Sequence, residues 1–155
     1  MKKTLPQIRV TAKQRANALD ALNNMWPSVP PENVAERLGT WRSGAGYALR
    51  DSPPTCNTIA CFGGWCAWWP AFRAQGVFVS AEGAPTIVDG RRHAFPVRRS
   101  PVYVAQHLFG HQGMFHPRGF LPTDTPSRHV SDHETVRMRL LWLIANSQII
   151  DGAKA

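Results

Sequence analysis

Apolar residues recur at helical spacing in several segments of this chain, and stretches rich in glycine and proline separate those segments. The sequence "TAKQ" at positions 11–14 is a capping box, in which a threonine hydroxyl and a glutamine side chain satisfy early backbone N–H groups. We therefore predict a helix that starts at Thr11 and ends at Pro27, because proline disrupts a helix interior. Its predicted apolar face is Ala16, Leu19, Leu22 and Trp26. A second, short helix is predicted over residues 32–38.

A longer helix is predicted from Thr55 or Thr58 to about Phe72, after the break at two consecutive prolines. It contains Gly63 and Gly64, each of which costs a helix about 1 kcal/mol relative to alanine. The pair therefore predicts a close approach of another backbone at this point.

Two more helices carry clear start and stop signals. In the first, Ser100 is the expected cap, Pro101 takes the first helical position, and Gly110 stops the helix. The second opens at "SDHE", a capping box at positions 131–134. Its predicted buried face is Val136, Leu140, Leu143 and Ile144.

Residues 77–99 interrupt the helical pattern. The runs "VFVS" and "TIV" are short and β-prone, and Gly83 lies between them, which predicts a small β-hairpin inserted between helices. The predicted fold is mostly α: a single compact helical domain over residues 1–155, with this hairpin and basic insert as a minor β part.

Charge is the most informative part of the composition. The formal net charge is +8 and the pI is near 10.3, a balance that favours nucleic acid or an acidic protein surface as partner. No acidic residue lies between Asp89 and Asp124. The candidate nucleic-acid or partner-binding residues of this window are Arg91, Arg92, Arg98, Arg99 and Arg118, accompanied by His93, His107, His111 and His116. The alternative is a solvated arginine-rich loop that only keeps the protein in solution.

The sequence predicts a cytoplasmic protein. No apolar run approaches the roughly 18 residues that span a bilayer, and the first residues lack the apolar region of a secretory signal. The odd number of cysteines, three, also suits a reducing compartment, where stable disulfides are rare.

Those three cysteines, Cys56, Cys61 and Cys66, follow one another at intervals of five residues. Close packing is the favoured interpretation, because cysteine behaves as a small apolar residue and two glycines lie beside it. A disulfide between the first two, or a Cys56 nucleophile with His107 as base, are alternatives. Zinc ligation by Cys56 and Cys61 with His107 and His111, or with the pair His129 and His133, is another, although structural zinc sites use closer cysteine spacing. We expect no cofactor and no metal.

Three tryptophans, Trp65, Trp68 and Trp69, follow the glycines. At helical spacing they share one broad apolar face, which favours core packing. The alternative is base stacking, as aromatic side chains do in single-strand binders.

The segment "CNTIACFGGW" resembles the motif Cys-Gly-Thr-x-x-Cys-x-x-Gly-Trp, which marks a family of small uncharacterised proteins from phages, prophages and actinobacterial mobile elements. The matching residues are Cys56, Thr58, Cys61, Gly64 and Trp65, and Asn57 replaces the usual glycine. The segments "RLGTWRS", "AQHLFG" and "MFHPRG" are also similar to that family, so the resemblance covers most of the chain outside residues 77–99. It implies a phage or mobile-element origin and action inside a bacterial host.

The sequence thus predicts a non-enzymatic accessory protein, with no catalytic residues, that binds nucleic acid or a host protein, such as a defence-related one, through its basic surface. An inhibitor of host defence falls within this class, but at +8 the chain cannot mimic DNA. Two alternatives stay open: a small cysteine- or zinc-dependent enzyme that uses Cys56 and Cys61 with histidines, and a structural component of a virion. The oligomeric state is not predicted.

Overall fold

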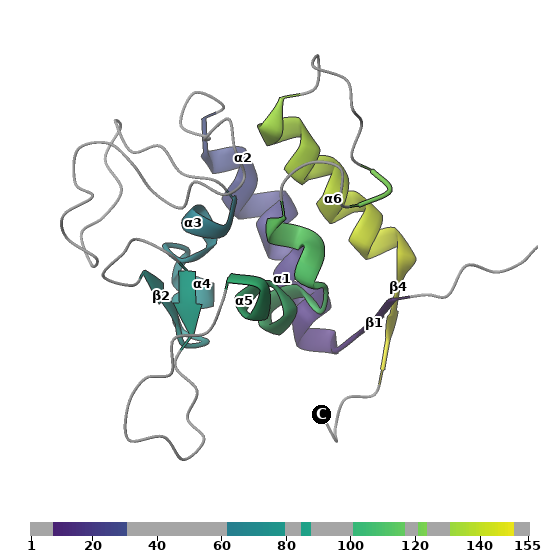
Figure 1. Cartoon of the computed structure of the whole chain (residues 1–155), viewed down its shortest axis with the longest axis horizontal. Helices are drawn as coiled ribbons and strands as arrows, with labels where there is room; N and C mark the ends of the chain where they lie inside the picture. The colour runs from purple at the N-terminus through teal and green to yellow at the C-terminus, as the bar shows by residue number, and fades with distance from the viewer. Residues whose placement is uncertain are drawn as a thin grey trace, which may run out of the picture.

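The N-terminal helical rod and the C-terminal helix lie side by side, and a third helix packs against the rod (Figure 1). The computed structural model describes residues 8–30, 62–79, 85–87, 101–116, 121–123 and 131–150. In these ranges the elements, in chain order, are β1 (Ile8–Val10), α1 (Ala12–Asp20), the π-helical η1 (Ala21–Met25), α2 (Trp26–Ser28), α3 (Phe62–Cys66), α4 (Pro70–Arg73), β2 (Val77–Val79), β3 (Pro85–Ile87), α5 (Pro101–Phe109), the 3₁₀ helix η3 (Gln112–Phe115), α6 (Asp132–Asn146) and β4 (Ser147–Ile149). The predicted fold class, mostly α with a minor β part, is confirmed.

The capping box at the start of α1 is confirmed. Gln14 N–H donates to Thr11 Oγ1 at 3.1 Å, and Thr11 N–H donates to Gln14 Oε1 at 2.9 Å. Of the predicted apolar face, Trp26 is buried and Leu22 packs partly buried against the core, but Ala16 and Leu19 are exposed. The buried positions of α1, η1 and α2 are Asn17, Ala18, Ala21, Met25 and Trp26.

Pro27 does not end the first helix, which continues to Ser28, before Val29 turns extended. The reason is the π-helical segment η1 before it, where Trp26 N–H donates to Ala21 O, five residues back. A wider π turn gives the proline ring room against the preceding carbonyls, which an α turn does not.

The helix predicted to reach Phe72 is broken within the described residues. α3 ends at Cys66, and α4 begins only at Pro70. Trp69 is extended, with φ −71° and ψ 125°, because the proline that follows it disfavours the helical backbone. Gly63 and Gly64 are buried, and the predicted start at Thr55 or Thr58 lies outside the described residues, as does the helix predicted over 32–38.

Gly110 stops α5 as predicted, with a left-handed φ of +77° that glycine adopts without strain. A Cβ added here would lie 2.8 Å from Gln14 Oε1 and 2.8 Å from Val10 Cγ1. The end of α5 is therefore pressed against the junction of β1 and α1. The cap expected at Ser100 lies outside the described residues.

Half of the capping box predicted for α6 is present. Ser131 Oγ accepts from Glu134 N–H at 3.2 Å, but the Glu134 carboxylate binds Arg137 one turn further on. The predicted buried face is confirmed at Val136, Leu140 and Leu143, and Ile144 is half-buried.

Two short pairs of strands complete the described fold. β2 and β3 pair antiparallel, with Val77 opposite Ile87, which is the predicted hairpin. β1 and β4 pair parallel, with Ile8 opposite Ser147, and the sequence analysis did not predict this sheet. It joins segments from the two ends of the chain (Figure 1).

Aromatic rings from distant segments form the centre of the core. Phe62 meets Trp26 edge to face, stacks on Phe109 with ring centroids 5.5 Å apart, and also contacts Phe115. Phe109 in turn meets Phe72 at 5.7 Å. This cluster joins the first helix, α3, α4, α5 and η3. None of the helices in the described ranges has both the length and the apolar character needed to cross a bilayer.

Candidate functional site

Most of the residues that the sequence singled out lie outside the described residues: Arg91, Arg92, Arg98, Arg99, Arg118, His93, His129, Cys56, Thr58 and Cys61. Their predicted roles stay predictions. Of the motif, Gly64 is buried and Trp65 is only half-buried, although packing at both positions was expected. Cys66 is a fully buried thiol.

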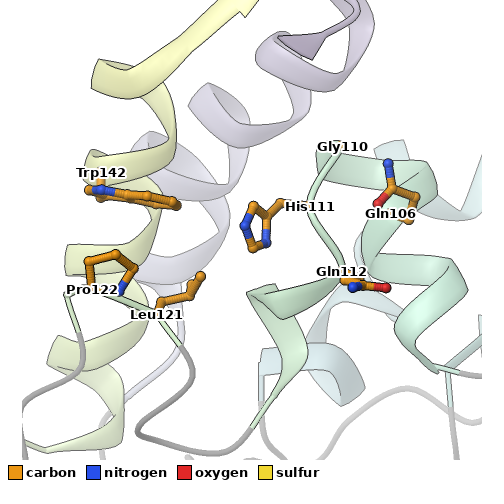
Figure 2. Close-up of a pocket in the computed structure, with 7 residues that line it drawn as sticks. All are labelled: Gln106, Gly110, His111, Gln112, Leu121, Pro122 and Trp142. Carbon is orange, nitrogen blue, oxygen red and sulfur yellow. The ribbon is translucent and has the colours of Figure 1, made fainter. Parts of the chain in front are cut away.

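A cleft of about 580 Å³ has both polar and apolar residues in its lining. It opens between the C-terminal end of α5, η3 and α6, and Figure 2 shows His111 between Trp142 and the pair Gln106 and Gln112. The lining residues are Gln106, Gly110, His111, Gln112, Leu121, Pro122 and Trp142. The sequence analysis missed this site, although a histidine directly after a helix-stopping glycine was a usable signal.

Gly110 sets the position of His111. Its left-handed backbone ends α5, and His111 then becomes the N-cap of η3, where Nδ1 accepts from Gly113 N–H at 2.9 Å. His107 and His111 therefore do not lie on one helical face, as the zinc alternative required. Since Nδ1 is an acceptor, the neutral ring carries its proton on Nε2.

Burial lowers the pKa of His111 below its usual value, and the positive charges of Arg139 and His116 lower it further. A buried Arg139 explains the second effect: it lies in α6 and donates to the Gly113, Met114 and His116 carbonyls at 3.2, 3.3 and 2.8 Å. The guanidinium thus binds the carbonyls of the η3 segment, and its charge adds to the effect of burial in favouring the neutral imidazole.

We expect His111 to make the stability of the protein depend on pH. The folded-state pKa is lower than the unfolded value of about 6.5, so the unfolded state takes up the proton first. Stability is full above about pH 6.5 and falls as the pH drops from there through the folded pKa.

Replacing His111 by asparagine keeps an N-cap acceptor that does not titrate, and it should flatten this dependence. Melting temperatures from pH 8 to pH 5 test it, with His107→Asn, at an exposed position of α5, as the matched control. Equal pH profiles for wild type and His111→Asn would contradict the assignment.

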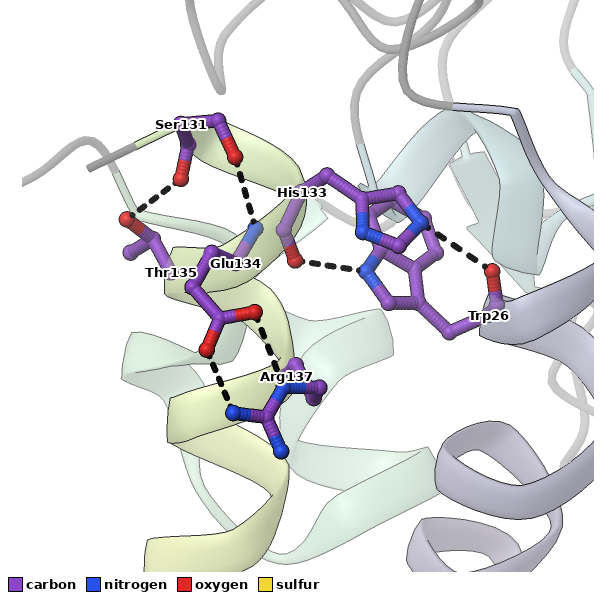
Figure 3. A network of polar contacts seen from close by, with 6 residues as sticks. All are labelled: Trp26, Ser131, His133, Glu134, Thr135 and Arg137. Atoms are coloured by element: carbon purple, nitrogen blue, oxygen red, sulfur yellow. Dashed lines mark hydrogen bonds and ion pairs between the residues drawn. The ribbon is translucent and has the colours of Figure 1, made fainter. Parts of the chain in front are cut away.

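His133, the other described histidine of the zinc alternative, packs on Trp26 (Figure 3). The rings stack with centroids 4.9 Å apart, and Trp26 Nε1–H donates to His133 O at 2.8 Å. His133 Nε2–H donates to Val29 O at 3.0 Å and to Trp26 O at 3.3 Å. This arrangement ties α6 to the end of the first helix. Within the described ranges, no group of three His, Cys, Asp or Glu side chains is placed to hold a metal ion.

The half-buried tryptophans Trp65, Trp68 and Trp69 line a smaller pocket of about 280 Å³. Trp69 Nε1–H donates to Asp20 Oδ2 at 2.6 Å, and the Arg73 guanidinium lies 4.8 Å from the Trp68 ring centroid. The rest of the lining is Met25, Ser28, Val29, Pro30 and Pro70, which is almost entirely apolar.

Comparison with known proteins gives no relative: no protein-family model, no curated protein and no solved structure matches this chain.

Proposed function

We propose that the protein acts without catalysis, by binding nucleic acid through Arg91, Arg92, Arg98 and Arg99, with Arg118 contributing. The observation that carries the proposal is the net charge of +8 together with the absence of any acidic residue between Asp89 and Asp124 in the sequence. Action inside a bacterial host, as an accessory protein of a phage or mobile element, is part of the proposal and depends on the family resemblance.

Three arginines of the described residues, Arg15, Arg137 and Arg139, make contacts within the fold. Arg15 donates to Ile144 O at 2.7 Å and to Ser147 Oγ at 3.1 Å, where α6 ends. Arg137 binds Glu134, and Arg139 binds three carbonyls of the segment around η3. Cations engaged in this way contribute little to recognition of a partner. The excess positive charge therefore belongs mainly to the rest of the chain, where the arginine-rich window lies.

The elements on either side of the first four arginines are well anchored. Residues 88–100 join β3 to α5, and these two elements contact each other. Ile87 at one end and Val104 near the other are both buried. Arg91, Arg92, Arg98 and Arg99 fall between these two elements in the sequence, so their replacement is expected to leave both elements intact.

Changing Arg91, Arg92, Arg98 and Arg99 together to alanine is expected to weaken binding by about tenfold or more. Wild type should bind labelled DNA or RNA with a dissociation constant of roughly 1–100 μM at physiological salt, the range of non-specific contacts. Fluorescence anisotropy measures the dissociation constants of wild type and of the variant. The matched control is Arg9→Ala with Lys13→Ala, which removes two exposed cations of β1 and α1.

Equal binding by wild type and the quadruple variant, or no binding by wild type even at low salt, would contradict the proposal. An acidic host protein would then be the partner to test, because the same charge also suits such a surface.

A further inference from the structure

We infer that the cleft between α5, η3 and α6 receives one unstacked nucleobase, so that the protein prefers single strands to duplex. The inference rests on the proposed function and adds what the arginines cannot supply, a contact with the base. Proteins that bind single strands combine cationic contacts to the backbone with aromatic side chains on which bases stack.

The aromatic surface of the cleft is Trp142. It is half-buried in α6, and His111 meets it at right angles, with ring centroids 5.7 Å apart and planes at 82°. The two rings do not stack on each other, and the indole lines the cleft, where a planar ligand can contact it. Leu121 and Pro122 add apolar surface on the same side, as Figure 2 shows.

Polar groups face the same space from the opposite wall. His111 presents Nε2–H as a donor, since its Nδ1 is bonded to Gly113 N–H. Gln106 and Gln112 are exposed, and neither side-chain amide makes a hydrogen bond within the part of the chain that the structure describes. Each amide offers a donor and an acceptor, which is what the edge of a base requires.

The lining of the cleft is uncharged, which suits a neutral base better than a negatively charged phosphate. None of its seven lining residues is charged while His111 is neutral. The volume of about 580 Å³ admits a base with part of its sugar. The tryptophan pocket of Trp65, Trp68 and Trp69 is the weaker candidate, because its lining offers no side-chain amide.

The test uses fluorescein-labelled single strands of twelve deoxythymidines and of twelve deoxyadenosines, and the duplex of the two, at one moderate salt concentration. Trp142→Leu should lose roughly 5- to 100-fold in affinity for the single strands, the range of one stacked base, and keep its affinity for duplex. Gln106→Ala with Gln112→Ala should change the ratio between the two single strands. The control is Leu141→Ala, an exposed neighbour on α6 that does not line the cleft.

The outcomes separate this inference from the proposed function. If wild type binds both strand forms equally and Trp142→Leu changes neither, the base site is overturned and charge-driven binding stands. If the quadruple arginine variant binds like wild type, the proposed function fails. If Trp142→Leu unfolds, the double glutamine variant decides, because both glutamine side chains are exposed. An unchanged ratio of its affinities for the two single strands would then overturn the inference.

Discussion

Replacing Arg139 by methionine is expected to lower the free energy of unfolding by about 3–5 kcal/mol, because it leaves several buried acceptors unpaired. The side chain is fully buried, and its Nη1 donates to the carbonyls of Gly113, Met114 and His116. Methionine fills much of the same volume but donates nothing. For a chain of this length the melting temperature should fall by roughly 10 °C.

The matched control is Arg137→Met, two residues earlier in the same helix. Arg137 is exposed and pairs with Glu134 on its own helix, so this variant should melt close to wild type. Arg139→Lys separates charge from geometry, since lysine keeps the charge but not the planar fork of donors. If Arg139→Met and Arg137→Met melt at the same temperature, Arg139 does not hold η3.

Replacing Trp26 by alanine is expected to lower the free energy of unfolding by about 3–5 kcal/mol, as truncation of a core tryptophan does. Trp26 is 1% exposed, packs edge-on against Phe62, and stacks on His133. Urea unfolding measures the loss. Trp26→Phe keeps most of the ring and removes the N–H that binds His133 O, so it should cost about 1–3 kcal/mol.

Trp65→Ala is the comparison variant, because the sequence motif pointed to Trp65 as a core residue. The structure places it at the edge of the core, half-buried against a pocket. In the same urea experiment, Trp65→Ala should lower the free energy of unfolding clearly less than Trp26→Ala does. Equal losses would mean that the core is centred on the motif and not on Trp26.

Local signals in the sequence predicted three helix boundaries correctly. Thr11, Ser131 and Gly110 act through contacts within a few residues of themselves, so their roles can be read without the tertiary fold. The break before Pro70 was readable in the same way, from the effect of proline on Trp69, but the apolar run through the tryptophans obscured it.

Long-range features were not readable. The parallel pairing of β1 with β4 joins residues almost 140 positions apart, and neither strand has a strong β pattern. Arg139 lies in a helix with other charged residues, and the sequence analysis did not single it out. The carbonyls of Gly113 and His116, in the segment that folds against α6, help make burial of this arginine favourable.

The candidate cleft illustrates the same limit. Gln106, His111 and Trp142 are ordinary residues in sequence, and they form one surface only because α5 ends where α6 passes it. The charge of the arginine-rich window, in contrast, is a property of composition and needs no fold to be recognised.

The salt dependence of binding tests the central claim most directly, because each phosphate neutralised by a cation releases condensed counterions. The measurement is the slope of log K against log salt concentration for a labelled single strand, for wild type and for the variant with Arg91, Arg92, Arg98 and Arg99 changed to alanine. If these arginines contact phosphates, the wild-type slope is steeper by up to about three. Identical slopes for the two proteins would contradict the account.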